Sequence, residues 1–144
     1  MVKMFKYFRH TADAKFEAKG KTLEEVFINS ACAMINLITD INKIASVKSE
    51  KIFLKSKTVE NLLIDFLNEL LFLLEVKNFV PAAKNHSIKI KINPGEVKIR
   101  GRLKGDNIQK YEHHGHIKSA TYHEFLFKKL PNGCGYKTRI VVDI

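Results

Sequence analysis

The segment KTLEEVFINSACAMINLITD, residues 21–40, decides the fold class because it carries a complete helix signal. Thr22 is an N-cap residue and Glu25 follows it three positions later, which is the pattern of a capping box. Apolar side chains then recur at the spacing of one helix face, at Val26, Phe27, Ala31, Met34, Ile35 and Ile38. The segment therefore predicts an amphipathic helix that starts after Thr22.

A second helix is expected over residues 58–77, TVENLLIDFLNELLFLLEVK, with Thr58 as its N-cap. Its broad apolar face consists of Leu62, Leu63, Phe66, Leu67, Leu70, Leu71 and Leu74. Strands are expected before and between the helices, at residues 2–8, 14–18 and 49–57, where apolar and polar residues alternate.

From residue 87 onward the hydrophobic period changes to two, which is typical of strands. The alternating segments are residues 87–92, 96–103, 117–127 and 136–144, and turn-forming residues separate them. The sequence therefore predicts an α+β, two-layer single domain over residues 1–144. We expect a mostly antiparallel sheet of six or seven strands, with both amphipathic helices on one of its faces.

Composition excludes several classes of protein. The chain of 144 residues is 45% hydrophobic and carries a net charge of +10, so it should attract polyanions. Its longest apolar run, residues 70–74, is too short to cross a bilayer, and we expect a cytoplasmic protein without a membrane partner. Cys32 and Cys134 form no CxxC motif, which fits a reducing compartment.

A basic sheet face is expected on the strands at residues 87–92 and 96–103. Its members alternate with the apolar residues Ile88, Ile90, Val97 and Ile99, and they are Lys89, Lys91, Lys98, Arg100, Arg102 and Lys104. Two interpretations stay open, a solvated face of a one-sided sheet and a face that contacts RNA. The interleaving residues are aliphatic and point inward, which favours the solvated face because bases stack on aromatic rings.

Three aspartates, Asp13, Asp40 and Asp143, stand at the ends of expected elements, and Asp143 is followed only by Ile144. Clustered carboxylates repel one another unless a proton or a cation joins them. Oxygen ligands favour hard ions such as Ca²⁺, Mg²⁺ or Mn²⁺. Aspartates at element ends are more often caps or turn residues, so spacing alone leaves both roles open.

Other candidate groups are weaker. Asp65 and Glu69 share a helix face and could form a general acid–base pair, although a solvated stripe explains them as well. The loop histidines His113, His114 and His116 match no closed zinc pattern. The familiar nucleotide-binding and hydrolase motifs are absent, so an enzyme with its own catalytic machinery is not the leading hypothesis.

Four motifs together resemble the archease family: HTAD at residues 10–13, the helix LLIDFLNELL, the strand IKSATYH and the terminal VDI. The resemblance covers nearly the whole chain. It implies an accessory protein, not itself an enzyme, of the tRNA-splicing RNA ligase. That ligase joins a 2′,3′-cyclic phosphate or 3′-phosphate end to a 5′-hydroxyl with GTP and Mn²⁺, and archease promotes its guanylylation and multiple turnover.

The resemblance also leaves an alternative function, a chaperone-like modulator of tRNA processing, for example of a tRNA methyltransferase. Such a protein would bind RNA or its partner through the basic face. In either case tRNA would be contacted indirectly or through that face.

The family's metal ligands correspond to Asp13, Asp143 and the terminal carboxylate of Ile144. The implied cofactor is a divalent cation, with Ca²⁺ expected first and Mg²⁺ or Mn²⁺ as alternatives. Further positions that match the family are Asp40, Glu69, Lys118, Thr121 and Tyr122. Many relatives have an acidic residue where this chain has Arg9, which predicts weaker binding of the ion here.

Overall fold

Two α-helices and eight β-strands make up the described part of this computed structural model, residues 4–9 and 13–144. The helices are α1 (Leu23–Ile35) and α2 (Val59–Lys77). The first four strands are β1 (Phe5–Arg9), β2 (Asp13–Gly20), β3 (Lys48–Ser56) and β4 (Phe79–Pro81). The others are β5 (Ser87–Asn93), β6 (Glu96–Asn107), β7 (Ser119–Lys129) and β8 (Tyr136–Asp143).

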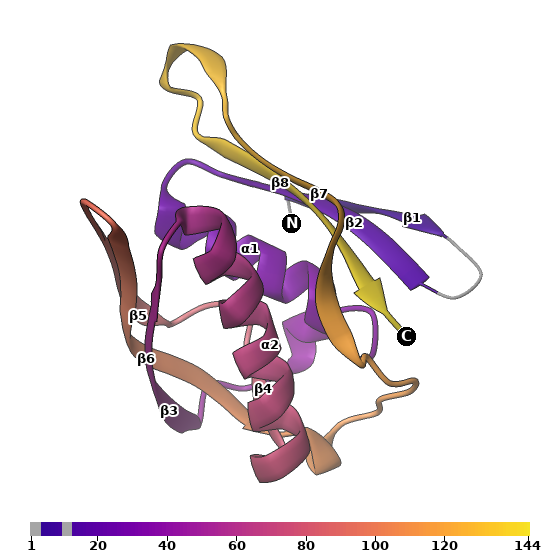
Figure 1. Ribbon diagram of the computed structural model, residues 1–144. Helices are drawn as coiled ribbons and strands as arrows, with labels where there is room; N and C mark the ends of the chain where they lie inside the picture. The colour runs from indigo at the N-terminus through magenta and orange to yellow at the C-terminus, as the bar shows by residue number, and fades with distance from the viewer. Residues whose placement is uncertain (1–3, 10–12) are drawn as a thin grey trace.

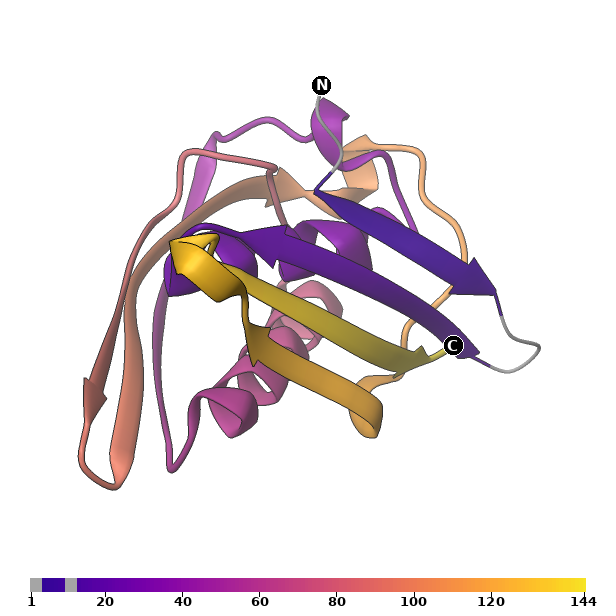
Figure 2. The same ribbon diagram turned by 90° about the horizontal axis from the view of Figure 1, so that it is seen from above.

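The strands form two antiparallel sheets with the helices between them. One sheet has the order β1-β2-β8-β7 and is called the β8 sheet below. The other has the order β3-β6-β4, with β5 also paired to β6, and is called the β6 sheet. Figures 1 and 2 show both helices lying between the two sheets, and each helix contacts strands of both.

The α+β class, the antiparallel strands and the two helices confirm the sequence prediction, but the prediction of one sheet with both helices on one face was wrong. The reason lies in the helices themselves. Nearly all of α1 after its first turn is buried, at Val26, Phe27, Ser30, Ala31, Cys32, Ala33, Met34 and Ile35. A helix buried on most of its circumference needs apolar partners on two sides, which one sheet cannot supply.

Both predicted helix starts are confirmed. The hydroxyl of Thr22 accepts a hydrogen bond from the backbone N–H of Glu25 at 3.1 Å, and Thr58 does the same for Asn61 at 3.1 Å. These bonds satisfy amide groups that lack a partner in the first helical turn. Helix α2 ends at Asn78, whose left-handed φ of 56° stops the helix before β4.

The core fills the space between the two sheets. Its largest side chains with almost no exposure include Phe16, Phe27, Phe66, Met34, Ile99 and Leu103. Phe16 comes from the β8 sheet and Ile99 from the β6 sheet, so both sheets present apolar side chains to the helices. Among the described residues, no helix combines the length and the apolar character that a membrane span requires.

Two details of the strands were not expected. Strand β4 follows α2 directly and pairs with the end of β6, placing Val80 opposite Asp106. Strand β7 is interrupted by an irregularity between Thr121 and Leu126, where Glu124 has a φ of 50°. An interruption of this kind turns side chains away from the regular alternation of the strand.

Candidate metal site

The two aspartates from opposite ends of the chain lie side by side. Strands β2 and β8 pair in a register that places Asp13 directly opposite Asp143, and Ser119 of β7 lies opposite Asp143 on the other side. In Figure 2 the C-terminus lies beside the start of β2. Phe16 and Ile140 of the same two strands face the core, so alternation places both aspartates on the outer face of the β8 sheet.

Placing two carboxylates directly opposite one another is unfavourable, because the like charges are only about 5 Å apart between their Cβ atoms. One oxygen of Asp13, Oδ1, is buried, whereas Asp143 is exposed. Ile144, which follows Asp143 directly, is 47% exposed. The site therefore combines a partly enclosed oxygen with accessible ones, a donor set that suits a hard divalent cation.

The side chains alone offer few ligands. Among the residues described, no group of three or more His, Cys, Asp or Glu side chains converges on one point. The pair formed by Asp13 and Asp143 thus gives two carboxylates, and the family resemblance implies the terminal carboxylate of Ile144 as the third oxygen donor. Ca²⁺ takes six to eight oxygen ligands, so water or a partner molecule would complete its shell.

Lys15, two residues after Asp13, is the nearest cation along β2, and it is already paired with another acid. Its Nζ forms an ion pair with Glu124 at 3.3 Å and lies 5.6 Å from the centre of the Phe8 ring. Arg9 pairs with Ala14 through the backbone of β1 and β2. The side chain of Arg9 and the residues His10, Thr11 and Ala12 of the HTAD motif lie outside the described residues.

Lys118 and Asn68 hold the strand that borders the site. The backbone N–H of Lys118 donates to the carbonyl oxygen of Asp143 at 2.8 Å. Asn68 of α2 accepts a hydrogen bond from the N–H of Ala120 at 2.8 Å and donates to its carbonyl oxygen at 3.2 Å. This role of Asn68 was not predicted from the sequence, although the residue lies within the LLIDFLNELL motif.

Asp40 caps a short helix. It lies just before a 3-10 turn (Ile41–Lys43), and its Oδ1 accepts a hydrogen bond from the N–H of Asn42 at 3.1 Å. Asp40 also lines a surface hollow together with Lys110 and His114. None of the contacts found among the described residues joins it to Asp143, so its part in binding an ion stays a prediction.

The remaining candidates on α2 and β7 have mainly structural contacts. Asp65 accepts a hydrogen bond from the hydroxyl of Ser56 at 2.6 Å, which ties α2 to β3. Glu69, one turn later, is half-buried. The hydroxyl of Tyr122 accepts a hydrogen bond from Asn61 at 2.8 Å, and Thr121 donates to the carbonyl of Val141 at 2.8 Å.

The three histidines lie in an exposed loop. His113 contacts the carbonyl oxygen of Tyr111 through Nδ1 at 2.9 Å, and the N–H of His114 donates to the carbonyl of Ile38 at 2.8 Å. These contacts attach the loop to its neighbours.

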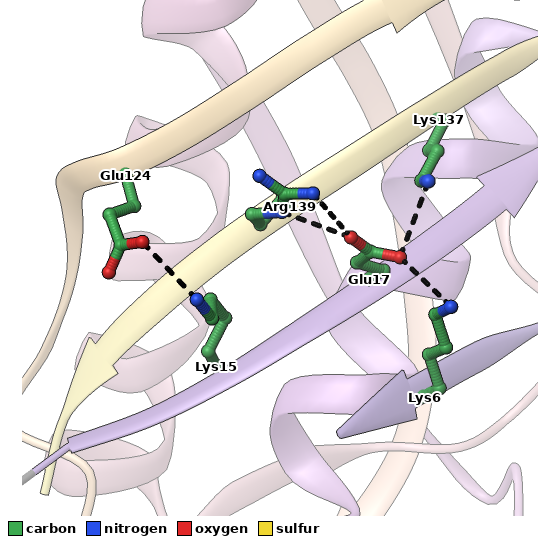
Figure 3. Close-up of polar contacts among 6 residues, drawn as sticks. All are labelled: Lys6, Lys15, Glu17, Glu124, Lys137 and Arg139. Atoms are coloured by element: carbon green, nitrogen blue, oxygen red, sulfur yellow. Dashed lines mark hydrogen bonds and ion pairs between the residues drawn. The ribbon is translucent and has the colours of Figure 1, made fainter. Parts of the chain in front are cut away.

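A buried acid lies on the same outer face, two strand positions beyond Lys15. Figure 3 shows Glu17 surrounded by Arg139, Lys137 and Lys6, with N···O distances of 2.9, 3.4 and 3.5 Å. Burial disfavours its charge, but the hydrogen bonds from Arg139 and Lys137 and the charges of Lys137 and Lys6 outweigh burial. They hold the pKa of Glu17 below its ordinary value.

Comparison with known proteins gives one consistent family. The profile of the archease protein family matches residues 5–144. The archease of Methanosarcina barkeri is 40% identical to this chain over 144 residues, which cover 99% of this chain and 97% of the relative. The archease of Pyrococcus furiosus is 30% identical and covers 99% of this chain and 100% of its own length.

A solved structure shares the fold. The solution structure of protein 1598 of Methanobacterium thermoautotrophicum superposes with a TM-score of 0.80 at 30% identity. The match covers 99% of this chain and 100% of that protein. The two-sheet arrangement with enclosed helices is therefore shared along the whole length.

Proposed function

The chain belongs to the archease family, and we propose that it acts as an accessory protein of the GTP- and Mn²⁺-dependent tRNA-splicing RNA ligase. Family membership supports an accessory role in RNA processing. The proposal adds the partner and the step: this chain promotes guanylylation of the ligase and restores it for further turnovers. It does so without a catalytic centre of its own, through a divalent ion held where β2 begins and β8 ends.

The observation that carries the proposal is the cross-strand pairing of Asp13 with Asp143. These two carboxylates and the terminal carboxylate of Ile144 would hold the ion, which we expect to be Ca²⁺, with Mg²⁺ or Mn²⁺ as alternatives. When bound, a divalent ion supplies positive charge that can neutralise phosphate oxygens. Because the protein supplies only a few ligands, coordination positions on the ion remain for oxygens of the partner or of its nucleotide.

The surroundings of the carboxylates suit contact with a partner. Ile144, which follows Asp143 directly, is 47% exposed, and Tyr122 of the neighbouring strand β7 is 51% exposed. Lys118 is also exposed and is fixed beside Asp143 by its backbone hydrogen bond. In the proposal these residues contact the ligase, and Asp13 and Asp143 act on the reaction through the ion they hold.

The function is tested by measuring GTP-dependent guanylylation of the purified ligase with and without this protein. We expect the native chain to stimulate the reaction, and Asp13→Asn and Asp143→Asn to lose the stimulation because an amide is a poorer ligand for a hard cation. Asp65→Asn is the matched control, since it makes the same change at an exposed carboxylate on α2. Full stimulation by folded Asp13→Asn and Asp143→Asn would refute the metal site, and no stimulation by the native chain would refute the ligase function.

The terminal carboxylate is tested separately by extending the chain by a few residues after Ile144. Extension replaces this carboxylate with a peptide bond and leaves Asp13 and Asp143 in place. We expect the extended protein to fail to stimulate guanylylation. Equal stimulation by both forms would retain the ligase as partner and remove Ile144 from the ligand set.

Ion binding has a readout that needs no ligase. With a chelator present, Asp143→Asn should raise the melting temperature, because it removes one of two opposed negative charges. With excess Ca²⁺, the native protein should gain stability and Asp143→Asn should not, since a ligand stabilises only the state that binds it. An equal increase in melting temperature on addition of Ca²⁺ in both proteins would contradict the assignment of Asp143 as a ligand.

A further inference from the structure

The outer face of the β6 sheet carries an ordered array of basic side chains. Strand β6 pairs with β3 on one side and β5 on the other, and the registers place residues of the three strands in cross-strand rows. The rows are Lys51–Arg102–Ser87, Phe53–Arg100–Lys89 and Lys55–Lys98–Lys91. Successive rows are about 6.6–6.8 Å apart along the strands, and neighbouring strands are about 4.8 Å apart. The face, called the basic array below, therefore presents seven Lys or Arg in a compact grid.

The positive charge of the basic array is almost unopposed. Among the residues that the structure describes, Lys98 is the one member in an ion pair with an acid, Glu96, at an N···O distance of 3.3 Å. Glu24 lines the same shallow hollow as Lys89 and Arg100, but its carboxylate accepts a hydrogen bond from the backbone N–H of Ile90. Like charges placed directly opposite one another destabilise a sheet, so an array of this kind favours an anionic partner.

An aromatic ring lies within the basic array. Phe53 is 57% exposed and lies opposite Arg100, and the Nζ of Lys55 is 5.5 Å from the centre of its ring. The hollow beside the ring is lined by Lys89, Lys91, Lys98 and Arg100. In the sequence only aliphatic residues alternate with the basic side chains of residues 87–104, and Phe53 joins them only because its strand, β3, pairs with β6.

We propose that the basic array binds an unpaired RNA strand, in a role independent of the carboxylate site. Lysine and arginine contact the phosphates, and Phe53 stacks on one base. Stacking on an exposed ring requires a base that is free of its own stack, which unpaired RNA offers and a duplex does not. Charge complementarity selects a polyanion, and the exposed ring among the charges selects an unpaired strand over a duplex.

The phosphate contacts are tested by filter binding of a short unpaired RNA oligonucleotide over a range of salt concentrations. The triple variant Lys55→Gln, Lys91→Gln, Lys98→Gln should bind more weakly. The magnitude of the slope of log K against log salt should fall by about 2, since each phosphate contact contributes about 0.7. The matched control is the triple variant Lys19→Gln, Lys128→Gln, Lys129→Gln, at lysines that are exposed on the β8 sheet. The control should keep the native slope.

The stacking contact is tested with Phe53→Leu, which removes the ring but keeps an apolar side chain. We expect the affinity for unpaired RNA to fall at least about fivefold, the lower end of the range for base–aromatic stacking. Phe72→Leu is the control, because Phe72 is 53% exposed but lies on α2. Thermal melting of each variant verifies that it is folded.

Three results would overturn the proposal. The first is that the native protein does not bind unpaired RNA even at low salt. The second is that the control triple variant loses as much affinity as the variant of the basic array, which would show attraction by net charge alone. The third is that a duplex of the same length binds as tightly as the unpaired strand and that Phe53→Leu changes neither affinity.

Discussion

The outer faces of the two sheets are built from similar residues but use their charge differently. On the β8 sheet a single acid, Glu17, is 5% exposed and is contacted by three cations, while Lys15 pairs with Glu124 (Figure 3). On the β6 sheet the described contacts of the basic array include one pair with an acid, between Lys98 and Glu96. The β8 sheet therefore neutralises the cations around Glu17 and Lys15 within the fold, whereas the basic array of the β6 sheet presents its cations to solvent.

The position of the acid explains the difference. Glu17 lies on β2, an interior strand of its sheet, so cations from β1 and β8 reach it from both sides. In the β6 sheet the interior strand is β6 itself, and its outward positions beyond the first residue, Glu96, are basic in the basic array. Glu17 lies in the middle of its strand, where cations of both neighbouring strands reach it, while Glu96 is the first residue of β6 and forms one ion pair.

The largest effect is expected from Glu17→Gln. Removal of this carboxylate leaves Arg139, Lys137 and Lys6 facing one another around a buried neutral group, which should lower the free energy of unfolding by about 2 kcal/mol. The value is below that for a fully buried pair because the cations are partly solvated. Glu96→Gln is the matched change on the β6 sheet and should stay within about 0.5 kcal/mol. Equal losses in urea unfolding would show that the two faces do not differ.

Each sheet contains a buried carboxylate that should contribute to the loss of stability at low pH. The pKa of Glu17 is lowered in the folded state, so the unfolded chain binds a proton first as the pH falls below about 4.5. Asp106 of β6 behaves likewise, because a hydrogen bond from Tyr111 lowers its pKa against the opposing effect of burial. We expect the contribution of these two carboxylates to stability to be full above about pH 5 and to be lost as the pH falls further.

The double variant Glu17→Gln, Asp106→Asn should begin less stable and lose less stability on acidification. Each single variant should remove part of the pH dependence of the free energy of unfolding, measured in urea at several pH values. An unchanged pH dependence in the double variant would show that other carboxylates control acid unfolding.

His86, which supports the β6 sheet, should cause a smaller loss of stability that begins at a higher pH than the loss from the carboxylates as the pH is lowered. Its Nδ1 accepts a hydrogen bond from the N–H of Lys104 at 3.0 Å, and its Nε2 lies 2.8 Å from the carbonyl oxygen of Ala82. Burial lowers the pKa of His86, so the unfolded chain binds the proton first below about pH 6.5.

Stability should therefore decline below pH 6.5, and His86→Gln should remove this part of the decline because glutamine does not titrate. His116→Gln is the control, since His116 is exposed in the loop before β7. Thermal melting between pH 5 and pH 7 measures both, and the idea fails if His86→Gln and His116→Gln have the same pH dependence.

The smallest effect is expected from single charges of the basic array. Arg100→Gln removes one of several neighbouring positive charges, so it should be neutral or raise the free energy of unfolding by up to about 0.5 kcal/mol at low salt. Arg139→Gln on the β8 sheet should instead lower it, because Arg139 donates to the buried Glu17 carboxylate at 3.0 Å. Melting temperatures at low and high salt measure both, and a loss for Arg100→Gln would contradict the unopposed charge of the array.

Local features were the most predictable part of the molecule. The N-caps Thr22 and Thr58 and the alternation in β5 and β6 depend on neighbours within a few residues, so the sequence indicates them directly. Strand β4 was missed because three buried residues, Phe79–Pro81, are too few to establish a period. The irregularity in β7 was missed because the segment around Glu124 keeps an apparent strand composition.

The candidate site was predictable only through the family resemblance. Asp13 and Asp143 each look like an ordinary residue at the end of a strand, and spacing alone does not relate them. Their placement in one cross-strand pair follows from the register of β2 with β8. That register depends on which side chains of the two strands face the core, since a slip of one residue would turn either Phe16 or Ile140 outward.

The sequence by itself determined the two helices, their first residues, most strands and the family. Hydrogen bonds at helix caps and hydrophobic periodicity act over short distances along the chain, so they can be read from neighbouring residues. Only the tertiary structure decided that the strands divide into two sheets, that Asp13 meets Asp143 and that Phe53 joins the basic array. Those placements arise because broadly apolar helices must be covered from two sides, and strand registers then bring distant residues together.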